Sequence, residues 1–481
     1  MELMKDMIIL LPGIMGSVLQ HNNQDLWGLS MGSLFRAGTA LGGNLINLKL
    51  GGDDHTVDDL GDGIKSTRLM EDTTIIPYFW KIDGYTKIAR MIQSKFQVVK
   101  GDLESEAPAN YYEFHYDWRR DNRVASRRLQ KLIERQLPIW RKSQGDPTAK
   151  VVLIAHSMGG VIARHYLEVE GGWLDCRLLI TFGTPFRGSL NTLNYMVNGY
   201  SKYLNVINQI IPTFTSCYQL LPIYKSVEVD GELKRASEIE GLENIDSERA
   251  KKAREFHLEI REAVKTNSKD LKYSEDFSIV PIVGNNQATY QSGKLIKNGG
   301  KTTLVISEDL PGSDYLESGD GTVPMTSAVP IEMKSDQVRS VIEQHGAVQN
   351  NKWVLEEVEF LLKNLRKNKP LTELFGGSND NVGINLKLED LYFDDESITM
   401  SAKLVNTTDF PERLAATFEN IDTGQIFTGS FTPEVGQWVL MRDPLPEGSY
   451  RLKVESASAD SGVNIASVNG LFLVASRKTV I

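Results

Sequence analysis

The chain is poor in cysteine and has no long apolar run. Its 481 residues include only Cys176 and Cys217, too few for a disulfide framework, which favours a reducing cytoplasm. We interpret both as buried thiols; a pairing between them or a catalytic role is the alternative. No stretch is long enough to span a bilayer. Residues 7–11 are apolar, but charges precede them and Pro12 ends them, so we expect no signal peptide.

Basic residues are also in deficit. The formal net charge is -10, which argues against nucleic acid as a partner and against electrostatic docking on anionic membranes. Any membrane contact would be mainly hydrophobic, so we expect a cytoplasmic protein that is at most peripheral to a membrane. The two cysteines and seven histidines show no metal-ligand spacing, and we predict neither a metal site nor an organic cofactor.

Apolar strands and amphipathic helices alternate along much of the chain. This alternation predicts an α/β fold with a mostly parallel sheet that is covered by helices on both faces. Strands are expected at residues 7–11, 97–99, 111–116, 151–154, 177–182, 278–284 and 302–306. Helices are expected at residues 84–96, 121–137, 161–167, 246–266 and 347–367.

The pattern divides the chain into four segments. Residues 1–190 form the first part of an α/β core, and within them the glycine-rich residues 18–80 form an excursion that covers part of the site. The alternation is lost in residues 191–275, which we interpret as an inserted cap, and it returns in residues 276–370. Residues 380–481 give short alternating strands and turns, which predict an accessory β-sandwich that binds a protein partner or mediates self-association.

The organising feature is the run of residues 150–160, in which a β-branched strand leads into A-H-S-M-G. This pattern is typical of a nucleophile elbow, a sharp turn that presents the Ser157 hydroxyl above the sheet. Ala155 replaces the first glycine of the usual G-x-S-x-G, and a small side chain meets the same need. Residues 161–167 have helical spacing, so the expected strand, turn and helix are all present.

A serine hydroxyl needs a base, and the base needs an orienting acid. In this fold the acid and the histidine follow the serine in that order, which leaves His257 and His345 as candidate bases. We expect His257 on the surface of a charged helix. His345 lies in a loop before the last core helix, and Asp320 lies upstream between two glycines, so these two are the predicted base and acid. The competing acids are Asp309, Asp314 and Glu317.

The oxyanion formed during attack needs two backbone N–H donors. One is expected from Met158, which follows the nucleophile at a helix N-terminus. The other is expected from Ile14, in the glycine-bearing loop at the end of the first core strand. A simple turn at residues 11–13 is the alternative for that loop.

Five motifs occur in an order that resembles the lecithin:cholesterol acyltransferase and lysosomal phospholipase A2 family, and the resemblance covers roughly residues 7–365. The motifs are Pro12-Gly13-Ile14-Met15-Gly16-Ser17, Tyr116-Asp117-Trp118-Arg119, Ala155-His156-Ser157-Met158-Gly159, Phe182-Gly183-Thr184-Pro185-Phe186-Arg187-Gly188 and Gly319-Asp320-Gly321-Thr322-Val323-Pro324.

The resemblance implies an α/β-hydrolase core, a cap, a membrane-touching excursion and phospholipid or related acyl-ester substrates. It also implies a triad of Ser157, Asp320 and His345, with Ile14 and Met158 as the oxyanion hole. The secreted and lysosomal relatives carry signal peptides and disulfides, which this sequence does not show, and the β-rich segment after residue 380 is not part of the family core.

The excursion contains apolar residues that can be interpreted in two ways. Leu26, Trp27, Leu34 and Phe35 could form an exposed surface that dips into lipid, or they could pack inside the cap. We favour contact with substrate or membrane, because an acyl chain must enter beside the oxyanion loop.

Three functional hypotheses follow. The first is a serine-dependent phospholipase or acyltransferase that acts at a lipid surface through an acyl-enzyme. The second is a soluble carboxylesterase or triacylglycerol lipase. The third is a non-catalytic scaffold whose sandwich recruits partners, and the intact order of serine, acid and histidine argues against it.

Overall fold

A computed structural model describes most of the chain. It covers residues 1–28, 45–71, 74–76, 80–199, 205–312, 319–333, 338–366, 382–407, 413–457 and 465–477. Within these ranges, none of the helices is both long and apolar enough to cross a lipid bilayer.

Six parallel strands form the central sheet, in the order β17-β14-β11-β10-β2-β9. Every residue of β2 and β10 is buried, because helices cover both faces of the sheet, and this explains their continuous apolar sequences. The parallel α/β core predicted from the alternation is confirmed. The strands are β2 (Met7–Leu11), β9 (Tyr111–Glu113), β10 (Val151–His156), β11 (Cys176–Phe182), β14 (Ser278–Asn285) and β17 (Arg339–Ile342).

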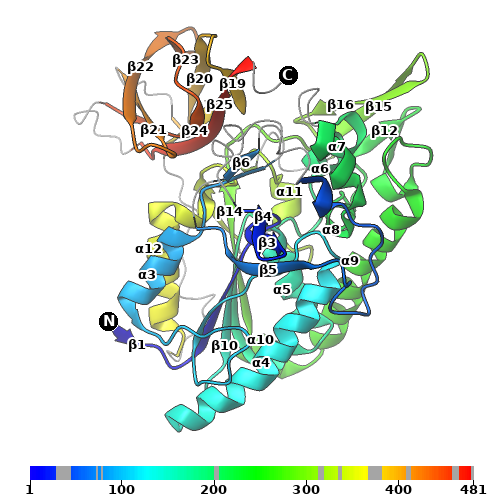
Figure 1. The fold of residues 1–481 in the computed structure, drawn as a ribbon, viewed down its shortest axis with the longest axis vertical. Coiled ribbons are helices and arrows are strands. Elements are labelled where there is room, and N and C mark those ends of the chain that lie inside the picture. The colour runs from blue at the N-terminus through cyan, green and yellow to red at the C-terminus, as the bar shows by residue number, and fades with distance from the viewer. Residues whose placement is uncertain are drawn as a thin grey trace.

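Two groups of helices cover the sheet (Figure 1). Helices α3 (Thr86–Lys95) and α12 (Lys352–Asn364) lie together on one side, and α4 (Asn122–Gln144) and α5 (Met158–Glu168) lie on the other, with α9 (Ser247–Asn267) packed against α5. The ends of α4 follow from its sequence. Asp121 accepts a hydrogen bond from the N–H of Arg123 at the start, and Gly145 takes a left-handed conformation at the end.

The segment between β11 and β14 leaves the central sheet. Its helices are α6 (Leu190–Asn198), α7 (Asn205–Ile210), α8 (Thr215–Gln219), α9 and α10 (Leu271–Asp276), with strands β12 (Val227–Val229) and β13 (Glu232–Lys234). Strands β12 and β13 join β15 (Ser292–Asn298) and β16 (Lys301–Ser307) in a separate sheet. The segment boundaries at residues 190, 275 and 370 stay predictions.

Two predicted strands lie outside the central sheet. The strand expected at residues 97–99 is β8 (Phe96–Gln97), which pairs with β1 (Glu2–Leu3) in a separate sheet. Residues 302–306 belong to β16, which pairs antiparallel with β15 outside the central sheet. The last strand of the central sheet is β17, with the sequence R-S-V-I. Because β17 is short and half polar, it lacks the apolar run that would predict a core strand. Strand β16 mixes polar and apolar residues in a pattern that also fits a strand of the core. A short helix, α11 (Met325–Ala328), lies between them.

The N-terminal excursion contains a small antiparallel sheet of β3 (Ser17–His21), β4 (Gln24–Trp27) and β5 (Ile64–Leu69). Strands β6 (Thr74–Ile76) and β7 (Trp80–Ile82) form a hairpin, and β1 (Glu2–Leu3) pairs with β8 (Phe96–Gln97).

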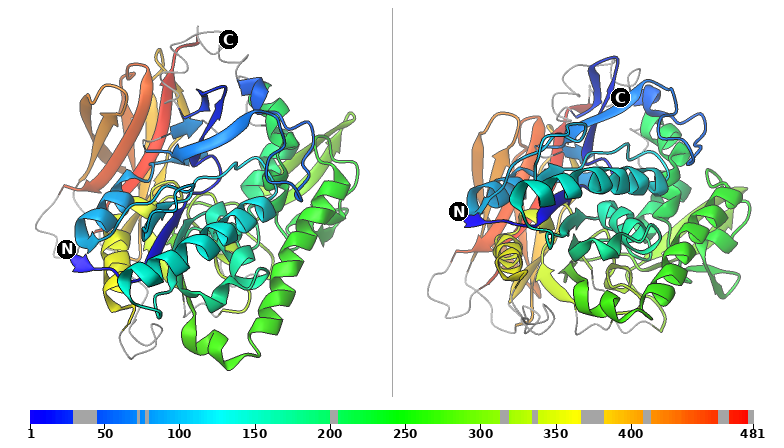
Figure 2. Two further views of the ribbon diagram at one scale, coloured as in Figure 1. Left: turned by 60° about the horizontal axis from the view of Figure 1, so that its bottom comes forward. Right: turned by 90° about the horizontal axis from the view of Figure 1, so that it is seen from below.

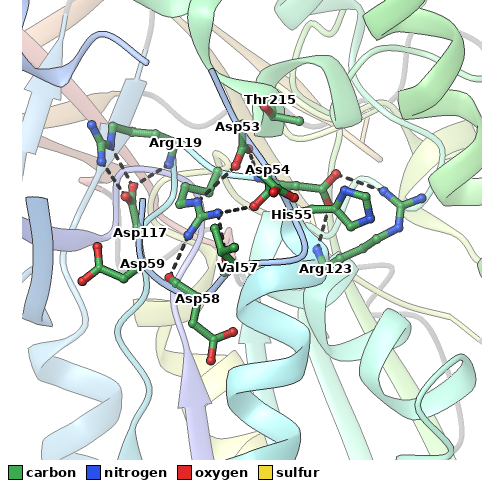
Figure 3. Close-up of polar contacts among 12 residues, drawn as sticks. Asp53, Asp54, His55, Val57, Asp58, Asp59, Asp117, Arg119, Arg123 and Thr215 are labelled. Atoms are coloured by element: carbon green, nitrogen blue, oxygen red, sulfur yellow. Dashed lines mark hydrogen bonds and ion pairs between the residues drawn. The ribbon is translucent and has the colours of Figure 1, made fainter. Parts of the chain in front are cut away.

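Two arginines hold the acidic loop of this excursion on the core (Figure 3). Arg119 is fully buried. It donates to Asp117 at 2.6 Å, a contact that Figure 3 shows, and to Asp62 at 2.9 Å. Arg120 donates to the Asp53 carboxylate at 3.1 Å and to backbone carbonyls in residues 54–58. Arg119 ends the Tyr116-to-Arg119 motif, so this motif anchors the excursion to the core.

The C-terminal residues form an eight-stranded, mostly antiparallel sheet in the order β18-β20-β23-β22-β21-β24-β25-β19. The first half of β22 pairs with β21 and its second half with β23, so the sheet folds back and encloses its own apolar core. Figure 2 shows this sandwich beside the half of the core that carries α3 and α12. Its strands are β18 (Gly383–Lys387), β19 (Leu391–Phe393), β20 (Ile398–Val405), β21 (Leu414–Asn420), β22 (Ile426–Glu434), β23 (Gln437–Arg442), β24 (Gly448–Ser456) and β25 (Val468–Ala475).

Candidate active site

Ser157 lies on a sharp turn between the central strand β10 and helix α5. Its backbone has φ 52° and ψ −125°, a conformation that side-chain-bearing residues rarely adopt and that costs about 1–3 kcal/mol. The Ser157 N–H donates to the carbonyl of Phe182 at 2.8 Å, which fixes the turn against β11. This is the geometry of a nucleophile elbow.

Two glycines allow neighbouring loops to approach this turn. A Cβ on Gly159 would collide with the Pro12 carbonyl, so the first glycine loop packs directly on the start of α5. Gly183 has φ 52°, and a Cβ there would lie 2.7 Å from Asp320 Oδ2 and 2.9 Å from His345 Nδ1. Both positions need glycine because the backbone itself lines the site.

His345 lies within hydrogen-bond distance of both Ser157 and Asp320. Ser157 Oγ is 3.0 Å from His345 Nε2, and His345 Nδ1 is 2.7 Å from Asp320 Oδ2. A carboxylate only accepts, so the Nδ1–H of His345 donates to it, and Nε2 is left to accept the serine proton. The structure therefore brings the three predicted residues together with the tautomer that a general base requires.

Asp320 is held by its own loop. Its Oδ1 accepts from the N–H groups of Thr322 and Val323, at 2.9 and 2.6 Å, and its carbonyl accepts from the N–H of His345 at 2.8 Å. The carboxylate is buried, so these bonds keep Oδ2 pointed at the imidazole. Asp309, a competing candidate, has its backbone N–H and carbonyl bonded to the hydroxyl groups of Ser307 and Ser292; Asp314 and Glu317 lie outside the described residues.

The predicted oxyanion donors lie on two segments in contact. Met158 is the first residue of α5, where an N–H has no partner within the helix. Ile14 lies in the loop that packs on Gly159, and two tyrosine hydroxyls hold that loop. Tyr116 donates to the Pro12 carbonyl at 2.8 Å, and Tyr85 accepts from the Gly13 N–H at 2.7 Å.

His156 and Tyr85 form a buried network that the motifs did not reveal. His156 Nε2 is 3.1 Å from the carbonyl of His345, so this nitrogen carries the proton. Its Nδ1 accepts from the Tyr85 hydroxyl at 3.0 Å, and that hydroxyl accepts from Gly13. Burial, with a smaller effect of His345, holds the pKa of His156 well below its usual value.

This network joins the oxyanion loop, the elbow and the histidine loop through one imidazole. The only signal for it in the sequence is a histidine at the end of an otherwise apolar strand, and nothing marks Tyr85, which is 71 residues away.

The predicted contact residues differ from expectation. Leu26 and Trp27 are 9% and 2% exposed, and the Trp27 indole N–H donates to the Met15 carbonyl at 2.9 Å. The prediction that these two contribute to an exposed apolar surface is wrong, because both pack into the core with the indole N–H satisfied. Leu34 and Phe35 lie outside the described residues.

His257 is a second correction. We expected it on the surface, but it is buried and its Nε2–H donates to the Gln219 carbonyl at 2.7 Å. Burial lowers the pKa of His257 to about 4. Both cysteines are free and buried, as interpreted, and burial raises the pKa of each thiol to about 12.

A cavity of about 360 Å³ reaches His345 and Asp320 from the side of the C-terminal sandwich. Its lining comes from three parts of the chain. The core contributes residues 320–322 and 344–347, α6 contributes Asn191, Asn194 and Tyr195, and the sandwich contributes residues 386–390 and Asn469.

The parallel sheet, the elbow after β10 and the hydrogen-bonded serine, histidine and aspartate define an α/β-hydrolase. Residues 76–298 match the family model of lecithin:cholesterol acyltransferase, which confirms the resemblance seen in the motifs. The fold and this family match together support a lipid-ester hydrolase or acyltransferase in general terms.

Two solved structures of the Bacillus licheniformis lipase BlEst2 also align with the chain, at low sequence identity. The propeptide form is 10% identical, with a TM-score of 0.30, over 98% of this chain and 93% of its own. The mature form is 12% identical, with a TM-score of 0.29, over 74% of this chain and 91% of its own. No curated protein matches the chain.

Proposed function

We propose that this protein cleaves acyl esters of phospholipids or related lipids through an acyl-enzyme on Ser157. The observation that carries the proposal is the hydrogen-bonded relay from Ser157 through His345 to Asp320 at the end of the central strand. The match of residues 76–298 to the lecithin:cholesterol acyltransferase family supports a lipid ester as the substrate.

Each step follows from the geometry of these groups. His345 Nε2 takes the Ser157 proton as Oγ attacks the ester carbonyl, and Asp320 holds the imidazolium that forms. The N–H groups of Ile14 and Met158 stabilise the oxyanion. The C–O bond then breaks, and His345 gives its proton to the leaving alcohol. Water, or an acceptor alcohol, resolves the acyl-enzyme by the same steps in reverse.

A second candidate is a carboxylesterase or triacylglycerol lipase that needs no phospholipid surface. It is favoured by the burial of Leu26 and Trp27, which removes two residues from the surface expected to touch lipid. The two candidates share the relay and differ only in substrate.

Two experiments test these proposals. A fluorophosphonate probe should label the wild type but not Ser157→Ala, and p-nitrophenyl butyrate turnover should be lost in that variant while its urea midpoint is unchanged. Equal turnover in both proteins would refute acyl chemistry at Ser157. Fatty acid release from phosphatidylcholine liposomes, compared with release from tributyrin, then separates the two substrates: release from tributyrin alone would favour the second candidate.

A further inference from the structure

We propose that Glu343 is a positioning residue through which the C-terminal sandwich holds the His345 loop in place. The inference rests on the proposed function, because it assigns His345 the role of base. It also gives the sandwich a part in catalysis, beyond that of an accessory domain.

Glu343 is a fully buried carboxylate that accepts four hydrogen bonds. Its side chain is 0% exposed. Oε1 accepts from the N–H groups of Gln344 and Asn469, both at 3.0 Å, and Oε2 accepts from the side-chain amides of Asn469 and Asn351, at 2.9 and 3.1 Å. All four partners are donors, so the ionised form is the one that this site fits.

The four donors belong to three separate parts of the molecule. Gln344 immediately precedes His345, Asn351 caps the start of α12, and Asn469 lies on β25 of the sandwich. A buried carboxylate is costly unless its acceptors are filled, so Glu343 requires the sandwich to be docked. Burial raises the pKa of Glu343, and the hydrogen bonds from Asn469 oppose that rise.

The sandwich makes further bonds on both sides of the site. The amide of Gln344 donates to the Leu386 carbonyl at 3.3 Å. Gln287, whose N–H donates to the Gly319 carbonyl beside Asp320, exchanges two bonds with β18: it donates to the Ile384 carbonyl at 3.0 Å and accepts from the Leu386 N–H at 3.2 Å. The loops of the acid and of the base are therefore both fastened to the same strand.

Two ion pairs fasten the segment against which the histidine loop packs. Lys81 pairs with Asp390 at 2.5 Å, and Asp83 accepts from Arg451 Nε at 2.9 Å. The Asp83 N–H in turn donates to the carbonyl of Gly346, the residue after His345, at 2.8 Å. Figure 1 shows the sandwich strands β20 to β25 at the end of the core where β6 and α11 lie.

The direct test is Glu343→Gln, which places an NH₂ group against the donors of Asn469 and Asn351. We expect kcat for p-nitrophenyl butyrate to fall about tenfold or more, because a displacement of about 1 Å at a catalytic base can cost about 10²-fold. KM should change less than twofold, since Glu343 does not line the described cavity. Labelling of Ser157 by the fluorophosphonate should slow by the same factor as kcat.

An exchange variant separates positioning from general loss of stability. Asn469→Asp alone places two carboxylates against each other and should also lower kcat. Glu343→Gln combined with Asn469→Asp again places a donor opposite an acceptor, so the double variant should recover most of the lost kcat. Asn469→Ala, which removes one donor of four, provides a milder variant if Glu343→Gln does not fold. Its kcat should fall severalfold.

Asn420→Ala is the matched control. Asn420 is a buried asparagine that holds a turn within the sandwich through bonds to the N–H groups of Asp422 and Thr423, both at 3.1 Å. Its loss should lower the urea midpoint and leave kcat unchanged.

Several outcomes would overturn the inference. They are a kcat for folded Glu343→Gln within twofold of the wild type, a rise in kcat, a failure of the exchange to restore activity, and an equal loss in Asn420→Ala. A wild type that is not labelled at Ser157 would refute the proposed function, and this inference with it. A labelled wild type with unaffected variants would refute this inference alone.

Discussion

Replacing Tyr85 with phenylalanine tests whether the buried network positions the oxyanion loop. The change removes one oxygen and leaves two groups without a partner, the Gly13 N–H and His156 Nδ1, which lie 2.7 and 3.0 Å from it. Tyr85 is buried, so water does not replace the hydroxyl. Each stranded group costs about 1–3 kcal/mol, which predicts a loss of about 2–6 kcal/mol in the free energy of unfolding.

The effect on catalysis follows from the position of Gly13 next to Ile14. Removing an oxyanion donor outright costs about 10²–10³ in kcat, and a displaced donor should cost less, so we expect a fall of about tenfold. KM should change little, because the donor acts mainly on the charge that develops during attack.

The assay combines initial rates on p-nitrophenyl butyrate with urea unfolding followed by tryptophan fluorescence, at a temperature where the variant is fully folded. Tyr112→Phe is the control, since this buried hydroxyl makes a single long bond of 3.5 Å to the Ala109 carbonyl. It should leave kcat unchanged. If Tyr85→Phe is destabilised but keeps kcat within twofold of the wild type, the network is structural and the reasoning is refuted.

Three further predictions follow from the described residues. Gly183→Ala should lower kcat at least tenfold with a smaller change in KM, because the added Cβ would displace Asp320 and His345. A kcat near that of the wild type would contradict this and would show that the loop of Gly183 can shift to accommodate the Cβ. Arg119→Lys should lower the free energy of unfolding by about 3 kcal/mol, measured in urea, because lysine cannot donate to Asp117 and Asp62 in the same geometry; a loss below about 1 kcal/mol would contradict this. The free energy of unfolding should also fall as pH is lowered from 6.5 toward 4. Burial lowers the pKa of His115 and His257 to about 4, so between these pH values the unfolded chain binds protons that the native chain does not. Each histidine contributes up to about 1.4 kcal/mol per pH unit. The difference in the free energy of unfolding between pH 7 and pH 5 should therefore be smaller in His257→Gln than in the wild type. An unchanged difference would contradict the assignment to His257.

Local patterns in the sequence predicted five of the six strands of the central sheet. The apolar run of residues 7–11 is the strand β2 with the same bounds, and the elbow at residues 155–159 has the strand before it and the helix after it. These elements were predictable because a strand buried on both faces needs a continuous apolar sequence, and a tight turn restricts side-chain size locally. Strand β17 escaped prediction because its burial comes from its neighbour β14 rather than from its own composition.

The direction in which a side chain points was harder to predict. Leu26, Trp27 and His257 were assigned to surfaces from local composition, and all three are buried. In an irregular segment, the local sequence does not determine whether an apolar side chain points toward lipid or into the core. Its direction depends on which surface of the folded protein lies opposite it.

The sequence by itself determined the α/β-hydrolase core and the candidates Ser157, Asp320 and His345, because local motifs mark the serine and the aspartate, and chain order with a loop before the last core helix marks the histidine. Only the tertiary structure decided that Tyr85 and His156 join the oxyanion loop to the histidine loop, and that Glu343 meets Asn469 across 126 residues. The physical reason is that hydrogen bonds between buried groups depend on distance and direction in three dimensions. A single sequence carries no mark of which distant donor will lie opposite a buried carboxylate.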